Sequence, residues 1–451
     1  MMGKMASKFR CLTPLIILLP LSLAAQVADD EDFSEAADDL VEALSSSMPA
    51  TSSRFFNSAH QVGYNYRPVF GGPNSPAGQM EETDRVTEPA FRLPGIYNKT
   101  QPWRDWKKRQ NEEHGLQLSG HYTTLYQSIS DTAPGQTEDK ASGGVFRATA
   151  IWTVLGDSNK ADADFGAINV MLDHRHAYRD IAPAGLASQA GYTGVTGTLY
   201  SDTDFVVVNL NWTQSFAGRK GGILVGRYDP NDYMNILGYV NPWTTFSNIS
   251  VLLDSSVAYS DAGWGAAGGF WLKDQWYVLG GFNDANGKLT DDLEFFDGGS
   301  EFYKFAELGW SPTQGDRYFK NIHLTYWHVD ERKDAMVDSG QGLAFAANWT
   351  LGDKWMPFMR AGISDGAEQV KIYEKSASAG LIWRYARLDL LGLGLNWGET
   401  PASQEQTTLE VFWRFQFAQN FAITPSVQYL VNPVSNPEDV WLFGLRMRLT
   451  F

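Results

Sequence analysis

The sequence contains a single cysteine, Cys11, in a chain of 451 residues. Cys11 lies inside an N-terminal stretch that has the features of a secretory signal, so the exported protein is expected to have no thiol. Disulfides, thiolate metal sites and cysteine nucleophiles are therefore excluded. Because Cys11 precedes the apolar run instead of following it, a lipoprotein anchor is not expected.

Long apolar runs are also missing. Residues 12–23 form an apolar run after three cations, with the small residues Ala24 and Ala25 behind it. This order is typical of a signal peptide, which we assign to residues 1–25. The alternative is a short membrane anchor, but about a dozen apolar residues cannot cross ~30 Å of hydrocarbon. No later run reaches the ~20 residues of a membrane helix, whereas a barrel strand needs only ~10 and buries alternate side chains.

Cations are in the minority. The chain has 36 Lys+Arg against 52 Asp+Glu, a net charge of −16, which argues against a nucleic-acid partner. The acidity suits acidic outer loops, and it is equally ordinary for a soluble secreted protein.

The sequence also lacks the motifs of common enzymes. HExxH and GxxxxGK[ST] do not occur, and GISDG at residues 362–366 lies at the end of an expected strand and not in a nucleophile elbow, so we predict that the protein is not an enzyme and has no cofactor. The neighbouring histidines His174 and His176 are expected on opposite faces of a strand, and we therefore predict no metal site.

The region before the β pattern has three parts. Residues 29–47 are acidic with apolar residues at helical spacing, which fits either a short amphipathic helix or a disordered tail. Residues 48–95 are rich in Pro, Gly, Ser and Asn and predict a linker. We assign residues 26–95 to an acidic periplasmic segment and linker. Residues 103–115, WRDWKKRQNEEHG, have helical composition and a glycine stop.

From residue 116 to the end, apolar side chains recur with a period of two, which predicts β-strands. The expected strands are 116–126, 145–155, 165–175, 203–216, 221–228, 265–272, 275–283, 301–311, 319–329, 341–351, 355–364, 375–385, 387–398, 406–417, 421–431 and 440–451. Long and short connections alternate, as in outer-membrane barrels with long extracellular loops and short periplasmic turns. The expected fold is all-β: a transmembrane antiparallel β-barrel of about 16 strands over residues 96–451, with a short helical N-terminal segment.

The two faces of these strands differ in polarity. The apolar faces include Trp441, Phe443, Leu445, Met447, Leu449 and Phe451 in the last strand, and Val206, Val208, Leu210 and Trp212 in residues 203–216. Tryptophans near the strand ends fit aromatic girdles at the two membrane interfaces, so the apolar faces are expected to meet lipid. The polar faces, which include Arg446 and Arg448, are then expected to line a water-filled channel.

Two stretches resemble the carbohydrate-selective outer-membrane porin family (OprB-like). One is ILVGRYDPNDY at residues 223–233, followed by NPWTTFSN at 241–248; the other is FAITPSVQYLVNPVSNP at 421–437, which leads into the last strand. The helical residues before the first strand resemble the pre-barrel segment of the family. The resemblance covers roughly residues 95–451, and the long segment 26–95 departs from it.

The resemblance implies a sixteen-stranded barrel in the cell outer membrane that passes mono- or oligosaccharides into the periplasm by facilitated passive diffusion. Loops folded inward would narrow the pore. The terminal Phe451 would be read by the barrel-assembly machinery, the outer face would contact outer-membrane lipid, and monomer and homotrimer are both left open.

Sugars are neutral and rich in hydroxyls, and arginine and carboxylate side chains can bind them by forked hydrogen bonds that still release the solute. The alternation predicts a pore-lining set of Arg227, Asp229, Arg147, Asp173, Arg175, Glu307, Arg360, Glu410, Arg414 and Arg446. Arg227 and Asp229, at the mouth of the longest loop, are the predicted constriction. For each residue the alternative is a structural ion pair that braces neighbouring strands.

Three functions remain open on the sequence alone. The leading one is a passive carbohydrate porin. The second is a general or ion-selective channel of the same fold, and the third is a secreted soluble β-protein that binds polysaccharide.

Overall fold

The structure is a computed structural model. It describes residues 70–84, 90–91, 93, 98–158, 160, 163–238, 240–289, 293, 299–352, 354–386 and 389–451. All described residues belong to one compact unit, Ser53–Phe451. The predicted signal peptide (1–25) and the acidic stretch 29–47 therefore lie outside the described residues.

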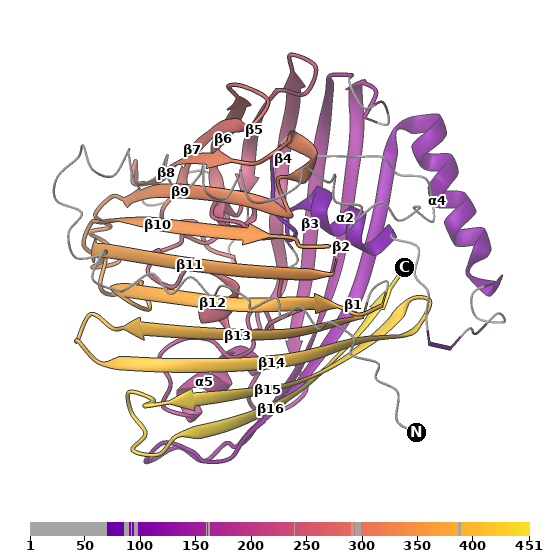
Figure 1. Cartoon of the computed structure of the whole chain (residues 1–451). Helices are drawn as coiled ribbons and strands as arrows, with labels where there is room; N and C mark the ends of the chain where they lie inside the picture. Colours follow the sequence, from indigo (N-terminus) through magenta and orange to yellow (C-terminus); the bar gives the residue numbers. More distant parts are fainter. Residues whose placement is uncertain are drawn as a thin grey trace, which may run out of the picture. The chain divides into compact units, whose positions relative to one another are not determined.

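Sixteen antiparallel strands form a closed barrel in which each strand pairs with its neighbours along the chain and β1 pairs with β16 (Figure 1). The strands are β1 Leu116–Ile129, β2 Lys140–Gly156, β3 Phe165–Ala177, β4 Asp204–Phe216, β5 Gly221–Tyr228, β6 Gly263–Trp271, β7 Trp276–Asp284, β8 Phe302–Trp310, β9 Lys320–Val329, β10 Gly340–Trp349, β11 Trp355–Gly366, β12 Lys375–Arg384, β13 Leu390–Glu399, β14 Glu405–Ala418, β15 Phe421–Val431 and β16 Val440–Thr450. The predicted fold class is confirmed, including the strand number.

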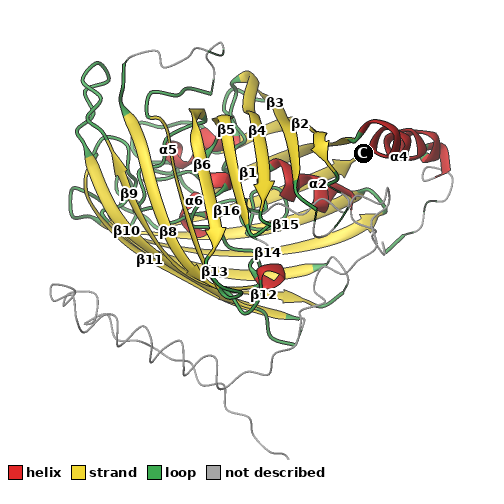
Figure 2. Ribbon diagram, turned by 90° about the horizontal axis from the view of Figure 1, so that it is seen from above, coloured by secondary structure: helices red, strands yellow, loops and turns green. Residues whose placement is uncertain are grey.

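The helical elements are few and short. They are α2 Pro76–Asp84, α4 Gln101–His114, α5 Leu186–Gln189 and α6 Ile249–Leu252, with 3-10 turns η3 Pro183–Gly185, η4 Pro230–Asp232 and η5 Gln314–Asp316. None of the helices in the described part of the chain is long and apolar enough to cross a membrane. Figure 2 shows α5 and α6 within the ring of strands and α4 outside it.

The helix predicted before the first strand is α4. It has proline in its first turn, where the missing N–H costs no hydrogen bond. It ends at Gly115, which has a φ of 66° and donates its N–H to the carbonyl of Asn111. A left-handed residue at this place favours glycine, so the glycine stop also turns the chain into β1.

Long connections gather at one end of the barrel and short ones at the other. The ranges 178–203, 229–262 and 285–301 join strands at the first end, and 217–220, 272–275, 350–354, 385–389 and 419–420 at the second. The predicted alternation of loop lengths is confirmed.

Side chains alternate between an exposed outer face and an enclosed inner face. In β16, Trp441 and Phe443 are exposed whereas Arg446 and Arg448 are buried, as predicted. Aromatic pairs stand at both ends of the outer face: Trp355 stacks on Trp383 with ring centroids 5.1 Å apart, and at the other end Tyr429 stacks on Trp441 at 4.3 Å. These pairs fit the two interfacial girdles of a membrane barrel.

The predicted face of β4 is wrong at Val206 and Val208. Both side chains are buried on the inner side, against Met171. In the pairing with β3, Asn209 lies opposite Met171 and Val207 opposite Leu172, so Val208 is an extra residue. Such a bulge shifts the alternation by one residue, and a strict period of two cannot anticipate it.

The lipid-facing assignment predicts a position-specific cost. Leu395 lies in the middle of β13 and is 47 % exposed, so Leu395→Arg should lower the free energy of unfolding by ~2–4 kcal/mol. Denaturant titration of the protein in phospholipid vesicles measures this value. The matched change Met336→Arg, at a loop residue 83 % exposed, should have little effect. Equal losses at both positions would contradict the assignment.

Candidate functional site

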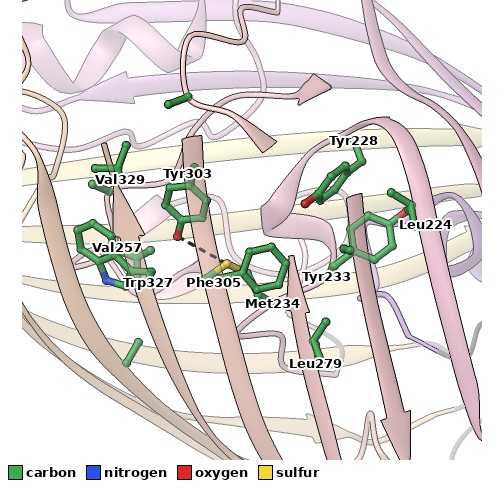
Figure 3. Close-up of a cluster of buried hydrophobic side chains, with 14 of the residues drawn as sticks. Leu224, Tyr228, Tyr233, Met234, Val257, Leu279, Tyr303, Phe305, Trp327 and Val329 are labelled. Atoms are coloured by element: carbon green, nitrogen blue, oxygen red, sulfur yellow. Dashed lines mark hydrogen bonds between the residues drawn. The ribbon is translucent and has the colours of Figure 1, made fainter. Parts of the chain in front are cut away.

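The loop 229–262 folds into the barrel and contacts the inner wall on two sides of the lumen. On one side Tyr233, Met234 and Val257 pack against luminal residues of β8 and β9, and the hydroxyl of Tyr303 lies 3.6 Å from the sulfur of Met234 (Figure 3). On the other side Phe246 packs edge-on against Phe412, with ring centroids 4.9 Å apart. The loop therefore crosses the lumen and narrows it.

Local sequence shapes the loop. Asp229 accepts a hydrogen bond from the backbone N–H of Asn231 at 2.9 Å and so caps η4, which has proline at its start. Asn248 caps α6 in the same manner, by accepting from the N–H of Ser250 at 3.0 Å. Asx caps followed by short helical turns are a common way to fold a loop back on itself.

Glu410 of β14 and Arg446 of β16 hold the far part of the loop. One oxygen of the Glu410 carboxylate accepts from the N–H of Ser247 at 2.8 Å, and the other accepts from the N–H of Asn248 at 3.0 Å. Arg446 donates to the carbonyls of Pro242, Thr245 and Phe246. Both side chains are buried, so these charge-assisted bonds act in a medium of low dielectric.

Arg360 and Glu307 hold the near part of the loop. Arg360 donates to the carbonyls of Val251 and Leu252, where α6 ends, and to the carbonyl of Asn235 at 3.2 Å. Glu307 accepts from the backbone N–H of Asn235 at 2.7 Å. Asn235 is thus bonded on one side by a cation and on the other by a carboxylate.

Arg147, Asp173 and Arg175 form a triad on β2 and β3. Arg147 bonds to both oxygens of Asp173, at 2.6 and 2.7 Å, and Arg175 shares one of them at 2.7 Å. The guanidinium of Arg147 also lies over the indole of Trp243, 4.6 Å from the ring centroid. The triad therefore supports the loop through a cation–π contact as well as bracing the wall.

The remaining predicted residues lie at the wall. Arg227 donates to the carbonyls of Val207 and Lys288, at 2.7 and 2.6 Å, and Arg414 donates to Gln416 at 3.0 Å. All ten predicted residues thus face the lumen or begin its loop. The contact of Arg227 with a solute stays a prediction, as do those of the other nine residues.

Residues 70–84, which the sequence assigned to the linker, lie in the lumen. Ala77 and Met80 of α2 are buried against Ile151, Phe165 and Ala167 of the inner wall. A signal for this helix is present in Ser75-Pro76: Ser75 accepts from the N–H of Gly78 at 3.3 Å, and proline follows the cap. The high content of Pro and Gly in residues 48–95 predicted a linker, and the signal for this helix was therefore missed.

The histidine prediction is also wrong in geometry. His174 and His176 lie on the same face of β3, with ring centroids 5.2 Å apart, because residues two apart in a strand share a face. Within the described ranges no group of three or more metal-ligating side chains comes together.

Burial changes the acidity of the loop. Burial, with a smaller contribution from the Asp261 carboxylate, raises the pKa of Asp229 to about 6. Burial and then the neighbouring Asp229 raise the pKa of Asp232 well above its usual range. The loop therefore loses negative charge when the pH falls only slightly below neutral.

A closed sixteen-stranded barrel with girdles of aromatics, long loops at one end and a loop folded into its lumen is the fold of transmembrane porins. Among solved structures, the chain is similar to the high-pH structure of Pseudomonas putida OprB, with 12 % identity and a TM-score of 0.61 over 77 % of this chain and 97 % of that one. The low-pH structure of the same protein gives a TM-score of 0.45 at 12 % identity, over 81 % and 100 %. A mutant porin of Rhodopseudomonas blastica gives 0.44 at 12 % identity, over 74 % and 100 %.

The sequence comparison concerns the C-terminal part of the barrel. Residues 331–451 match the model of the carbohydrate-selective porin family, OprB. No curated protein sequence matches the chain. The resemblance predicted from the sequence is confirmed over these residues, which are similar to the carbohydrate-selective porin family.

The anchoring role of Glu410 can be tested by Glu410→Gln. An amide presents an NH₂ group where the loop N–H groups now meet oxygen, so the anchor should weaken by ~1.5–3 kcal/mol and the loop should leave the wall. We expect a higher single-channel conductance in planar bilayers. Glu405→Gln, at an exposed position of the same strand, is the control. Unchanged conductance in both variants would show that Glu410 does not hold the loop.

The loop pKa predicts a pH-dependent ion preference. Asp229 is ionised at pH 7 and protonated at pH 5, so acidification removes a negative charge and should shift the channel toward anions, with a midpoint near 6. The reversal potential in a KCl gradient measures the shift. Asp229→Asn should reduce it, whereas Asp334→Asn, in an exposed loop, should leave it intact. A shift that survives Asp229→Asn would assign it to other groups.

Proposed function

We propose that the protein is an outer-membrane porin through which carbohydrates diffuse passively into the periplasm. The observation that carries this proposal is the pairing of opposite charges around the lumen. Arg147 and Arg175 flank Asp173, and Arg317 lies 3.8 Å from Glu307. A lumen of paired charges has no field of one sign to sort ions, and it offers many fixed donors and acceptors to a neutral polyhydroxyl solute.

Several luminal donors support the same proposal. Within the described part of the chain, no protein atom accepts from Nε of Arg360 or Arg446, or from the indole N–H of Trp327. A buried donor without a partner costs free energy, so these groups favour a solute or water that can accept a hydrogen bond. These donors are enclosed, so a sugar hydroxyl or ring oxygen can meet that need only when the contacts around them open.

The ends of the fold fit the proposed location. Phe451 continues β16 beside β1, where its N–H donates to the carbonyl of Gly120 at 2.9 Å. Its ring stacks on the exposed Phe146 at 5.9 Å. We propose that outer-membrane lipid covers this face and that the assembly machinery reads Phe451 before the barrel closes. The same wall and loop contacts suit a channel and not an enzyme.

The test is transport by the purified protein in liposomes and planar bilayers. We expect saturable influx of neutral mono- and oligosaccharides, block of the ion current by added sugar, and weak preference between K⁺ and Cl⁻. Arg227→Ala and Asp229→Ala then ask whether the predicted constriction contacts the solute, since either change should alter the block. Strong ion preference without sugar block would favour an ion-selective channel, and recovery as a soluble protein without detergent would favour the polysaccharide-binding alternative.

A further inference from the structure

The segment 70–84 contacts the lumen along its whole length. At its start, Phe70 lies beneath the guanidinium of Arg317, 5.3 Å from the ring centroid, and the carbonyl of Gly71 accepts from the hydroxyl of Tyr318. At its end, Glu82 lies 3.5 Å from Arg448 and accepts from Asn241 at 3.2 Å. The segment thus runs between the β8–β9 turn and the β1–β16 seam, inside the barrel.

The centre of the segment is Asn74. The oxygen of its side-chain amide accepts hydrogen bonds from Arg147 at 2.8 Å and from the indole N–H of Trp243 at 2.7 Å. Its amide donates to the carboxylate of Asp232 at 2.6 Å. Arg147 belongs to the wall, and Trp243 and Asp232 belong to the loop 229–262. The side-chain amide of Asn74 therefore joins the wall to this loop.

A sugar hydroxyl can make the three hydrogen bonds that this amide makes here. Its oxygen can accept from a guanidinium and an indole, and its O–H can donate to a carboxylate. A guanidinium, an indole N–H and a carboxyl oxygen set around one hydroxyl supply the two donors and the acceptor that it can use. Asn74 is only partly buried, whereas Arg147 and Trp243 are fully buried beneath it, so the site opens where Asn74 now lies.

We propose that Asn74 occupies, as a tethered surrogate, a sugar-hydroxyl subsite formed by Arg147, Trp243 and Asp232, and that residues 70–84 compete there with the permeating sugar. This inference rests on the proposed carbohydrate transport. It assigns to an N-terminal segment, outside the barrel strands, the control of one binding step in the pore.

The first test is Asn74→Ala, measured by sugar block of the single-channel current with glucose and maltose. Loss of the competing amide should lower the dissociation constant for sugar by about tenfold, equivalent to ~1.4 kcal/mol. Gln79→Ala is the matched control, because the Gln79 amide donates within the segment, to the carbonyl of Pro73 at 2.9 Å. A merely structural Asn74 would change the conductance in the variant but leave the dissociation constant as it is, and that result would overturn the proposal.

The second test fixes the segment in place. A Cβ built on Gly72 would lie 3.2 Å from Cβ of Ile236, near the ~3.5–4.5 Å of a disulfide, so Gly72→Cys with Ile236→Cys can join the segment to the loop. No other thiol is expected in the exported protein, because Cys11 lies in the predicted signal peptide. Oxidation should reduce sugar influx into liposomes, and a reductant should restore it. Equal influx in both states would contradict displacement of the segment.

The two levels of inference fail differently. If the wild-type protein and all variants show neither sugar block nor sugar influx, the proposed function is wrong. If the wild-type protein is blocked by sugar and Asn74→Ala has the same dissociation constant, transport stands and the surrogate role of Asn74 is wrong. Heat-modifiable migration in gels verifies that each variant forms a closed barrel.

Discussion

The pairing of β1 with β16 is the contact on which the rest of this structure depends. Without it, the backbone N–H and C=O groups at two strand edges would face hydrocarbon, where no water can form hydrogen bonds with them. The seam sets Thr123 opposite Arg448 and Leu125 opposite Arg446. Both arginines point inward, and from this one strand Arg446 holds the loop while Arg448 contacts Glu82 of the N-terminal segment. Closure of the sheet thus also creates the two attachment points that organise its interior.

The charged side chains that point into the barrel must then form hydrogen bonds with other groups of the interior. Glu410 and Arg446 act on the same stretch of loop with opposite polarity: the carboxylate takes the N–H groups of Ser247 and Asn248, and the guanidinium takes carbonyls just before them. A lysine could not replace Arg446 here, because one ammonium cannot direct donors at three carbonyls from a planar fork. The loop is held mainly through its backbone, so its side chains can vary while its course stays the same.

The sequence predicts most of the wall and little of the interior. Strict alternation and loop lengths suffice for β14 and β16, since one face of each strand must be apolar along its full length. The bulge at Val208 is not predicted, because the residues on both sides of it are apolar and the sequence does not show at which residue the alternation shifts. The alternation of side chains along each strand predicts which residues line the pore, but it does not predict their hydrogen-bond partners. Whether Arg227 donates to a solute or to a carbonyl depends on how a distant loop folds. The segment 70–84 was missed for the same reason, since its contacts are made only across the closed lumen.

These contacts also suggest how a filled lumen can still serve transport. Glu82 and Arg448 are oppositely charged and enclosed, so separating them would leave two charges without compensation. Asn74 is neutral, and each of its hydrogen bonds can be replaced by one to a hydroxyl at small net cost, because the number and polarity of the bonds are conserved. The segment is therefore held firmly at its end and exchangeably at its centre. The groups around Asn74 can therefore stay bonded with or without a solute, and passage at this point requires only the exchange of one set of hydrogen bonds for another.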